Sequence, residues 1–412
     1  MKAEIVTIGD ELLTGHTVDS NATYIARRLT EVGLSAIRIT SVGDSVDSME
    51  AAFRTALSGA DVVITTGGLG PTDDDITKKV IIKLFKRNLV FHEEILEDIR
   101  ARYARRGIDM PAINQNQALL PQGAILFANK HGSAVGICID EKNKLFISLP
   151  GVPSEMKQIM NDEVIPYLQK LDPDHHLSIV TIRTVGIVES RLAEIITSQI
   201  TFERNVKLAY LPALQGVALR VMATDENIEA AQKKAESTAR KLEMACSKYV
   251  FGRGDDTLEL VVGQLLRDND KTLAVAESCT AGMLAARITS PPGSSDYFSG
   301  GIAAYTNEVK SDLLGVNTEL LAEYGAVSRE CALVMAHNCR ERFEVDYALS
   351  ITGIAGPDGG TEDKPVGTVW IGLDCAHNSY AHHYLFGQDR DANRLRAVYT
   401  AMNLLRKEIL DI

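Results

Sequence analysis

Apolar, strand-like segments alternate with helix-like segments through the first 170 residues of the chain. The segments "DVVITTGG" (61–68) and "KLFISLPG" (144–151) have the composition of buried strands, and a helix-like segment follows each of them. Strands that alternate with helices favour a parallel sheet covered on both faces, because the chain must cross over between neighbouring strands. We therefore predict a doubly wound α/β domain over residues 1–171.

The middle of the chain has a different character. Residues 172–251 combine strand-like segments with one long helix-like segment, "NIEAAQKKAESTARKLEMACSK" (227–248). We predict a small α+β, KH-like domain that connects or dimerises. It lacks the G-x-x-G loop that clamps a nucleic-acid backbone, so a nucleic-acid adaptor is the weaker alternative. After "GRGDD" (252–256) the alternation of strands and helices returns, and we predict a second α/β domain over residues 252–412.

The overall composition narrows the class of partner. The chain carries a formal net charge of −12, and such an acidic surplus repels phosphate polyanions, which argues against nucleic acid. Its six cysteines are scattered without a C-x-x-C pair, which fits reduced thiols. No apolar run approaches the ~20 residues of a membrane span, and the N-terminal segment does not resemble a signal peptide. We expect a cytoplasmic protein without a membrane partner.

A glycine-rich loop follows a buried strand in "TTGGLGPTDDD" (65–75). Its glycines permit positive φ and close approach of a ligand, and the following helix offers free N–H groups to an anion. Three adjacent carboxylates exceed the single one that would cap the helix, and carboxylates beside phosphates usually hold Mg²⁺-like cations. The candidate residues are Gly67, Gly68, Gly70, Thr72, Asp73, Asp74 and Asp75.

Further polar residues follow other strands of the same predicted sheet. Asp10 and Glu11 follow the first strand, and Glu155 follows the strand at 144–151. Ligands of open α/β sheets bind at the carboxyl ends of the strands, so we expect these carboxylates to share an edge with the glycine-rich loop. Asn114 and Asn116, in "INQNQA", are weaker candidates for polar contacts.

The segments "IGDELLTGHTVDSNATYIARRL", "TTGGLGPTDDDITKKV", "NQNQALLP" and "LPGVPSEM" resemble the N-terminal domain of the competence/damage-inducible protein A (CinA) family. That domain is similar to the molybdopterin-binding fold. The resemblance implies hydrolysis of ADP-ribose to AMP and ribose 5-phosphate, dependent on a divalent metal such as Mg²⁺ or Co²⁺, and it implies a homodimer. A pterin- or nucleotide-binding regulatory module without turnover is the alternative.

The same resemblance assigns roles to the candidates at this edge. Asp74 and Glu155 become the leading catalytic residues, because a metal with carboxylates would activate water and neutralise the leaving phosphate. The implied metal ligands are Asp73, Asp74, Asp75 and Glu155. The implied substrate-binding residues are Gly67, Gly68, Gly70, Thr72, Asp10 and Asn116.

The C-terminal domain contains a second candidate site in "AESCTAGMLAARIT" (276–289). An apolar strand ends there, and Ser278, Cys279 and Thr280 precede a helix-like segment. Amide hydrolysis needs a nucleophile, a proton acceptor and donors for an oxyanion. Each of the three side chains is a candidate nucleophile, since a thiolate at a helix N-terminus is activated, and a purely structural helix cap is the remaining alternative.

A lysine in "YTNEVKSDLLG" (305–315) is the best candidate base. Asn307 is expected to cap this helix, which places Lys310 near the third helical position, where the helix dipole destabilises an ammonium. Burial would lower its pKa further. Tyr305, at the end of the preceding strand, is expected to relay a proton or orient the amide. A solvated helix lysine is the alternative for Lys310.

The segments "AESCTAGMLAARIT", "GGIAAYTNEVKSDLLGV", "YGAVS", "YALSITGIAGPDGGTEDKPVGTVWIG" and "FGQDRDANR" resemble nicotinamide-nucleotide amidohydrolase, which deamidates nicotinamide mononucleotide (NMN) to nicotinic acid mononucleotide and ammonia. The resemblance makes Ser278 the nucleophile, assisted by Tyr305 and Lys310, without a cofactor. Thr280, Gly353, Gly356 and Arg390 are the implied substrate-binding residues, with Thr280 also a candidate helix cap.

One position departs from the pattern of that family. Ala281 stands where glycine is usual, and alanine argues against an essential positive φ at this position. Taken together, the two resemblances imply a bifunctional hydrolase of pyridine-nucleotide metabolism that acts on ADP-ribose and NMN.

Overall fold

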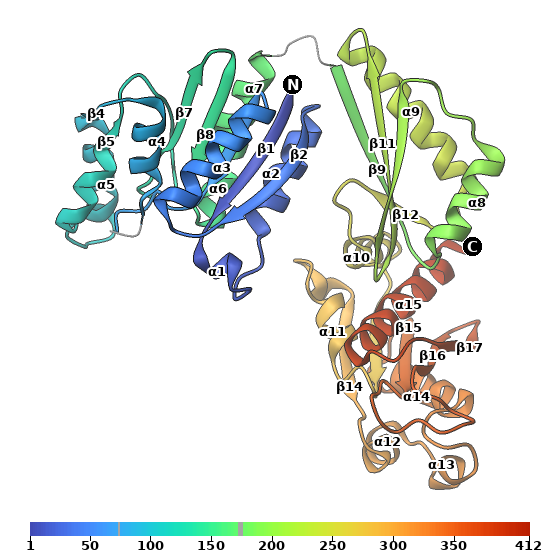
Figure 1. Ribbon diagram of the computed structural model, residues 1–412. Coiled ribbons are helices and arrows are strands. Elements are labelled where there is room, and N and C mark those ends of the chain that lie inside the picture. The colour runs from blue at the N-terminus through green and yellow to red at the C-terminus, as the bar shows by residue number, and fades with distance from the viewer. Residues whose placement is uncertain (73–74, 172–175) are drawn as a thin grey trace. The chain divides into compact units, whose positions relative to one another are not determined.

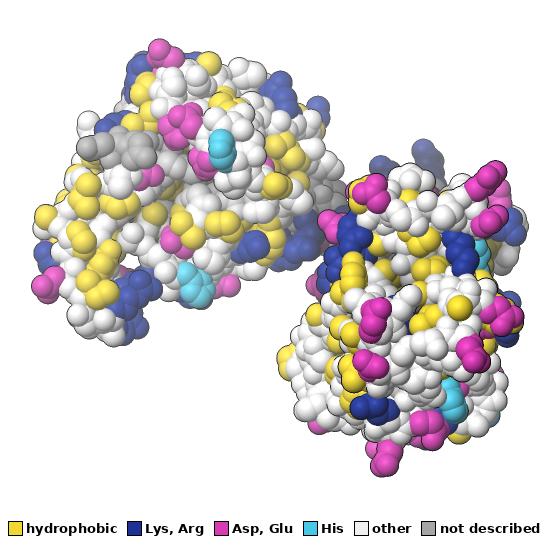
Figure 2. Space-filling model, turned by 90° about the horizontal axis from the view of Figure 1, so that it is seen from below, with side chains coloured by type: hydrophobic (Ala, Val, Ile, Leu, Met, Phe, Trp, Pro, Cys, Tyr) yellow, Lys and Arg dark blue, Asp and Glu magenta, His cyan; other side chains and the backbone are white. Residues whose placement is uncertain are grey.

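The computed structural model describes residues 1–72, 75–171 and 176–412. The chain forms two compact units (Figure 1). The first contains Met1–Ser178 and Thr224–Ala231, and the second contains Ile179–Ala223 and Gln232–Ile412. Asp73 and Asp74 lie outside the described residues. Acidic and basic side chains are interspersed on the face seen in Figure 2, so the net negative charge is not gathered into one patch there.

The first unit is built on a six-stranded sheet in the order β2-β1-β3-β8-β7-β6. Its strands are β1 (Lys2–Ile8), β2 (Ser35–Val42), β3 (Val62–Thr66), β6 (Ile125–Phe127), β7 (Gly136–Glu141) and β8 (Lys144–Leu149). β2, β1, β3 and β8 run parallel, whereas β7 and β6 add an antiparallel edge. The short strands β4 (Leu89–Phe91) and β5 (Leu119–Pro121) pair separately.

Helices cover both faces of this sheet. They are α1 (Asp10–Leu13), α2 (Ser20–Glu31), α3 (Val46–Gly59), α4 (Thr77–Phe85), α5 (Glu93–Arg105), α6 (Pro153–Ile159) and α7 (Ile165–Leu171), with a 3₁₀ helix at Ala112–Ala118 and a π-helix at Met160–Val164. Successive residues of β1 point to opposite faces: Ala3 and Ile5 pack with α2, α6 and α7, and Val6 and Ile8 pack with α3 and α4. The predicted doubly wound α/β domain is confirmed.

The second unit begins with a four-stranded sheet in the order β10-β11-β9-β12. Its strands are β9 (His176–Thr184), β10 (Val206–Ala213), β11 (Gly216–Asp225) and β12 (Val250–Arg253), and its helices are α8 (Glu189–Gln199) and α9 (Ile228–Ala245). One apolar cluster joins the sheet to both helices, through residues such as Leu192, Leu219 and Ala239. This is the small α+β arrangement that the sequence predicts.

A five-stranded sheet in the order β14-β13-β15-β16-β17 completes the second unit. Its strands are β13 (Leu273–Glu277), β14 (Phe298–Ala303), β15 (Tyr347–Gly353), β16 (Thr368–Cys375) and β17 (Ser379–Leu385). Its helices are α10 (Leu258–Asp268), α11 (Met283–Ile288), α12 (Asn307–Leu314), α13 (Thr318–Tyr324), α14 (Arg329–Phe343) and α15 (Arg390–Leu410). α10, α11 and α15 pack on one face, and α12 and α14 pack on the other.

The ends of three parallel strands meet at one edge of this sheet. Glu277, the last residue of β13, lies opposite Ala303 of β14 and Ile351 of β15. The loops that follow these strands therefore emerge side by side, which brings segments near residues 278, 305 and 354 together. None of the described helices is long and apolar enough to cross a membrane.

A buried arginine ties α15 to the four-stranded module. Arg406 is 2% exposed, and its guanidinium donates to the carbonyls of Val250 (3.0 Å) and Lys248 (3.1 Å) and to Asn403 Oδ1 (3.1 Å). The predicted boundary near residue 251 thus lies inside one compact unit. The three hydrogen bonds satisfy the buried guanidinium, because an unpaired buried polar group is costly.

We expect Arg406→Met to destabilise the second unit by about 2–4 kcal/mol, since it strands two carbonyls. The chain has a single tryptophan, Trp370 in β16, so tryptophan fluorescence during urea unfolding reports on this unit. Arg191→Met, at an arginine whose side chain is 67% exposed, is the control and should change stability by less than about 0.5 kcal/mol. Equal midpoints for the two variants would contradict the role of Arg406.

Candidate functional site

A tight turn at residues 278–282 links β13 to α11 and carries the three candidate nucleophiles. Ala281 has φ 49° and Gly282 has φ 90°, so two successive residues adopt left-handed conformations. The expectation that position 281 needs no positive φ is wrong. For alanine this conformation costs about 1–2 kcal/mol, so surrounding contacts must hold the turn in place.

Glu277 supplies the first of these contacts. Its carboxylate, 1% exposed, accepts hydrogen bonds from the backbone N–H groups of Gly282 (3.0 Å), Leu284 (3.0 Å) and Ala285 (2.8 Å). The prediction that Thr280 caps this helix is therefore wrong, because the carboxylate from the preceding strand satisfies the free N–H groups instead. Thr280 is fully buried, and its hydroxyl has no hydrogen-bond partner among the described residues.

Arg394 binds the backbone carbonyls of the same turn. From α15, its Nε donates to the carbonyl of Cys279 (3.1 Å) and its Nη2 to the carbonyl of Thr280 (2.9 Å). Glu277 thus fixes N–H groups and Arg394 fixes C=O groups on either side of the strained residues. Together they form a backbone clamp around the nucleophile turn.

Ser278 and Lys310 form the central pair of the site. Lys310 Nζ lies 3.0 Å from Ser278 Oγ, and it donates to the carbonyls of Ala304 (2.9 Å) and Tyr305 (3.4 Å). Ser278 is fixed by its own N–H, which donates to the Ile351 carbonyl at 2.8 Å. Burial lowers the pKa of Lys310 from its ordinary value. Lys310 is 1% exposed and forms no ion pair within the described residues, so the solvated-lysine alternative is wrong.

The local sequence places Lys310 slightly differently from the prediction. Thr306, not Asn307, caps α12, because the Thr306 hydroxyl accepts from Val309 N–H. Lys310 is therefore the fourth residue of the helix. Its amine still reaches back to the carbonyls of Ala304 and Tyr305, which come directly after β14.

The two rival nucleophiles are less suited to the role. Burial raises the pKa of Cys279 to about 11, so only on the order of one thiol in ten thousand ionises at pH 7. The side chain of Thr280 has no surface that a substrate could touch. Ser278 is 8% exposed and is the candidate with an amine beside its hydroxyl.

The implied substrate-binding residues partly converge on this edge. Arg390, the first residue of α15, donates to the Gly356 carbonyl (2.7 Å) and to the Tyr305 hydroxyl (3.2 Å). Tyr305 is 55% exposed. Gly353 ends β15, two residues after the carbonyl that accepts from Ser278. A planar cation and a phenol hydroxyl thus stand at the open side of the site.

The first unit also gathers its predicted loops at one edge. Asn21 Nδ2 donates to Thr66 Oγ1 (3.1 Å) and to the Gly151 carbonyl (2.7 Å), and Gly67 N–H donates to the Leu149 carbonyl (3.1 Å). A Cβ on Gly67, whose φ is 117°, would lie 2.3 Å from the Ile8 carbonyl oxygen. The loops after β1, β3 and β8 are therefore in contact, and only glycine fits between them.

The acidic end of the glycine-rich loop folds on itself. Asp75 Oδ2 accepts from the N–H of Thr72 (3.0 Å) and from its hydroxyl, and α4 begins at Thr77 without a side-chain cap. The alternative in which an aspartate caps this helix is therefore wrong for Asp75. Gly70 permits this contact, because a Cβ there would meet Asp75 Oδ2 at 2.2 Å. Gly68, with φ 64°, likewise leaves room for Thr77.

The remaining candidates of the first unit lie in separate contacts. Asp10 Oδ1 accepts from Asp44 N–H at 3.1 Å, and Glu155 Oε2 accepts from Asn129 Nδ2 at 2.7 Å. The Asn116 carbonyl accepts from Lys78 Nζ at 2.8 Å, and burial lowers the pKa of Lys78 to about 8. Asn114 donates to the Tyr103 hydroxyl at 2.6 Å. Within the described residues, these carboxylates do not converge as a set of three metal ligands.

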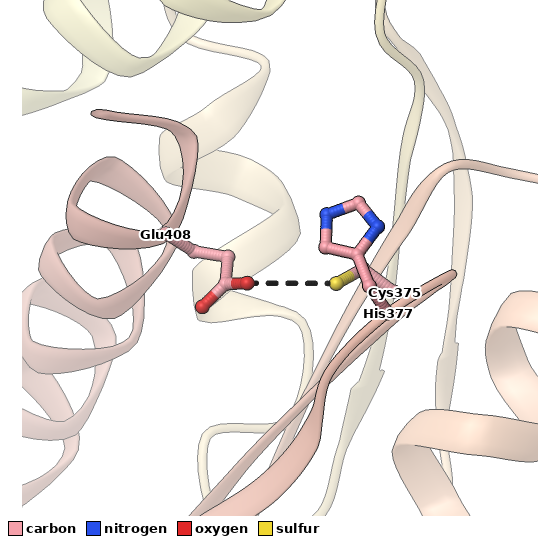
Figure 3. A group of neighbouring side chains, drawn as sticks. All are labelled: Cys375, His377 and Glu408. Carbon is pink, nitrogen blue, oxygen red and sulfur yellow. Dashed lines mark hydrogen bonds between the residues drawn. The ribbon is translucent and has the colours of Figure 1, made fainter. Parts of the chain in front are cut away.

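One group of metal-ligating residue types does occur among the described residues of the second unit. Figure 3 shows Cys375, His377 and Glu408, with the Cys375 thiol donating to Glu408 Oε1 at 3.6 Å. Asn378 and Tyr380 also donate to the two oxygens of Glu408, at 2.5 and 3.0 Å. Both oxygens are thus occupied, and the group serves to tie the β16–β17 hairpin to α15.

Three family models match successive parts of the chain. They are the probable molybdopterin binding domain (residues 4–170), the damage-inducible protein CinA KH domain (180–252) and the CinA C-terminal domain (255–409). A CinA-like protein of Chloroherpeton thalassium is 43% identical over 416 residues, covering 99% of both chains. A putative competence-damage inducible protein of Caldicellulosiruptor bescii is 39% identical over 411 residues and 100% of both. The chain belongs to the CinA family.

A solved structure adds to this comparison. The competence/damage inducible protein CihA from Agrobacterium tumefaciens is 39% identical and covers 36% of this chain and 92% of its own, with a TM-score of 0.36. The family models and the curated relatives confirm the resemblance to the CinA family, including its molybdopterin-binding-like domain and its C-terminal domain. They also confirm the predicted KH-like middle domain.

The sequence alone does not single out Glu277 and Arg394 as residues of this site. Glu277 reads as the end of an apolar strand, and Arg394 reads as one of several arginines on a long helix. A spacing of four from Arg390 places Arg394 on the same helix face, which is the signal that could have found it. Nothing local to Glu277 distinguishes a clamp from a solvated strand end.

The backbone clamp makes a testable prediction about Cys279. Arg394→Ala removes two charge-assisted hydrogen bonds from the turn, so local opening should become at least about tenfold more frequent. We expect Cys279 to be alkylated correspondingly faster, as measured by peptide mass spectrometry after a thiol reagent. Arg396→Ala, on the same helix without a polar contact to the turn, is the control. Unchanged alkylation in Arg394→Ala would refute the clamp.

Proposed function

We propose that the C-terminal domain hydrolyses the carboxamide of NMN to nicotinic acid mononucleotide and ammonia, without a cofactor. The observation that carries this proposal is the 3.0 Å pairing of Lys310 Nζ with Ser278 Oγ, in which the amine is buried and has no ion pair within the described residues. A neutral amine has two N–H donors and one lone pair. With two backbone carbonyls taking the donors, its lone pair faces the serine hydroxyl.

The proposed reaction proceeds through an acyl-enzyme. Ser278 Oγ attacks the amide carbon while its proton passes to Lys310 Nζ. The tetrahedral intermediate collapses with cleavage of the C–N bond, and the Lys310 ammonium returns the proton to the leaving ammonia. A water molecule then attacks the ester carbon and gives a proton to Lys310. The second tetrahedral intermediate collapses with cleavage of the ester C–O bond, Lys310 returns that proton to Ser278 Oγ, and the carboxylic acid leaves.

Arg390 and Tyr305 are the proposed contacts to the nucleotide. A guanidinium presents a planar fork of donors that suits a phosphate. Arg390 is held by the Gly356 carbonyl, so its position is set before substrate arrives. The half-exposed Tyr305 hydroxyl, which accepts from Arg390, stands beside it.

The catalytic roles are tested by ammonia release from NMN. Ser278→Ala and Lys310→Ala should each lower kcat by at least ~10²–10⁴-fold, because they remove the nucleophile and the base. Cys279→Ala is the control and should retain activity within a few-fold. Full activity in either of the first two variants would sink the mechanism, and loss of activity confined to Cys279→Ala would transfer the role to the thiol.

The pH profile provides an independent test. The base must be neutral, and burial lowers the pKa of Lys310 from its ordinary value. The rate should therefore rise with pH through this lowered pKa, with a midpoint below the ~10.4 of a free lysine. Measurement of kcat/KM from pH 6 to 10.5 gives the midpoint. A midpoint at or above that of free lysine would contradict a buried neutral base.

We further propose that the N-terminal domain hydrolyses ADP-ribose to AMP and ribose 5-phosphate with a divalent metal. The contact between the loops after β1, β3 and β8 supports a ligand site at this edge. Of the proposed ligands, Asp75 and Glu155 are described, and they do not form a complete set within the described residues. A bound metal would activate water and neutralise phosphate charge.

Chelation tests the metal requirement. ADP-ribose hydrolysis should fall to background in EDTA and recover with Mg²⁺ or Co²⁺, and Asp74→Asn should remain inactive after metal is restored. Hydrolysis insensitive to EDTA would contradict the metal. If ADP-ribose binds tightly but is not hydrolysed with any added metal, the alternative of a pterin- or nucleotide-binding regulatory module is favoured.

A further inference from the structure

A cleft separate from the Ser278 site opens within the second unit. It has a volume of 740 Å³ and lies between the four-stranded module and α15. Its walls are the loop 185–189, the turn 212–217, the end of β17 and one side of α15. We call this hollow the inter-module cleft. Its volume falls within the ~300–1,000 Å³ typical of small-molecule sites.

The cleft contains two cations that the protein does not neutralise. Arg396 and Lys407 are both on α15 and both half-buried, and their side chains have no hydrogen bond or ion pair in the described part of the chain. Burial and the charges of Arg406 and Lys248 lower the pKa of Lys407, which means that the surroundings are already positive. The lining contains one carboxylate, on the exposed Glu189. In a chain of net charge −12, a concave surface of this sign attracts an anion.

Aromatic rings form another part of the same lining. Tyr384 and Phe386 stack with centroids 5.8 Å apart and an interplanar angle of 10°, and Tyr399 also lines the cleft. Aromatic side chains offer stacking surfaces to planar ligand rings, and guanidinium groups bind phosphates. An aromatic wall beside two cations therefore selects a ligand with both a ring and a phosphate.

We propose that the inter-module cleft binds a nucleoside monophosphate, with the base against the aromatic wall and the phosphate between Arg396 and Lys407. The cleft is distinct from the Ser278 site, because none of the Ser278, Lys310 or Arg390 side chains lines it.

Packing and hydrogen bonds link the cleft to the segment around Gly356, which holds Arg390. Arg396 Nη1 lies 3.5 Å from where a Cβ of Gly387 would be. The buried Asn393 bonds both the N–H (3.0 Å) and the C=O (2.8 Å) of Gly387, and it donates to the Ala355 carbonyl at 3.0 Å. The neighbouring Gly356 carbonyl holds Arg390. Ligand binding that moves Arg396 is thus expected to shift the KM for NMN, a consequence that rests on the proposed amidohydrolase function.

Photolabelling of the full chain locates the ligand directly. The probe is 8-azido-AMP, and labelled peptides are mapped by mass spectrometry. We expect label on the segments 185–189, 212–217, 384–386 or 396–407, and a loss of at least tenfold in Arg396→Glu. Lys241→Glu, an exposed charge reversal on α9 outside the cleft, is the matched control and should label like the wild type. Label confined to other segments, or equal labelling in Arg396→Glu, would overturn the proposal.

Competition experiments separate recognition of the base from recognition of the phosphate. Unlabelled AMP should protect the cleft fully and inorganic phosphate partially, whereas adenosine should protect at least tenfold less well than AMP. Adenosine that competes as well as AMP would overturn the role of the cations. Because labelling requires no turnover, a chain that labels in the cleft but releases no ammonia from NMN would refute the proposed function and leave this site standing. A chain that hydrolyses NMN but is not labelled in the cleft would refute the cleft site and leave the proposed function standing.

Discussion

The burial of the Lys310 amine is the constraint on which the proposed active site of the second unit depends. A buried ammonium without a counter-charge is costly, and the protein lowers that cost by favouring the uncharged form. The two carbonyls that follow β14 then fix the direction of the amine. Ser278 must meet it at the end of β13, and a parallel sheet places these two strand ends side by side. The pairing of Ser278 with Lys310 therefore requires that β13 and β14 be parallel neighbours.

A strained turn can be held in place only by partners from elsewhere in the fold. Ala281 and Gly282 both adopt left-handed conformations, and the short α11 cannot stabilise them by itself, since brief helices are marginal alone. Glu277 satisfies the N–H groups from the preceding strand, while Arg394 reaches the carbonyls from α15, 115 residues further along the chain. The position of α15 depends in turn on Arg406 and the carbonyls near β12.

Patterns that repeat along the sequence predicted the fold well. Alternating strands and helices sufficed for both α/β domains, and the helical position of Lys310 was nearly correct. The errors concern single backbone positions. Thr280, Asn307 and an aspartate of the 73–75 run looked like caps by residue type, yet Glu277 and Thr306 have the first two roles, and Asp75 accepts from Thr72 instead of capping α4. Residue type does not reveal which nearby acceptor binds the free N–H groups at the start of a helix. The positive φ of Ala281 depends on tertiary contacts, which a local sequence pattern does not contain.

The candidate sites at the sheet edges of the two units differ in charge. At the edge of the second unit, the pair that does the proposed chemistry can be neutral, so the protein alone completes it. At the edge of the first unit, Asp10, Asp44 and Asp75 bring negative charge to loops that would meet a diphosphate. Carboxylates and a diphosphate repel each other unless a cation lies between them. The reaction proposed for the first unit would therefore need a divalent metal, whereas the reaction proposed for the second would need a lysine with a lowered pKa.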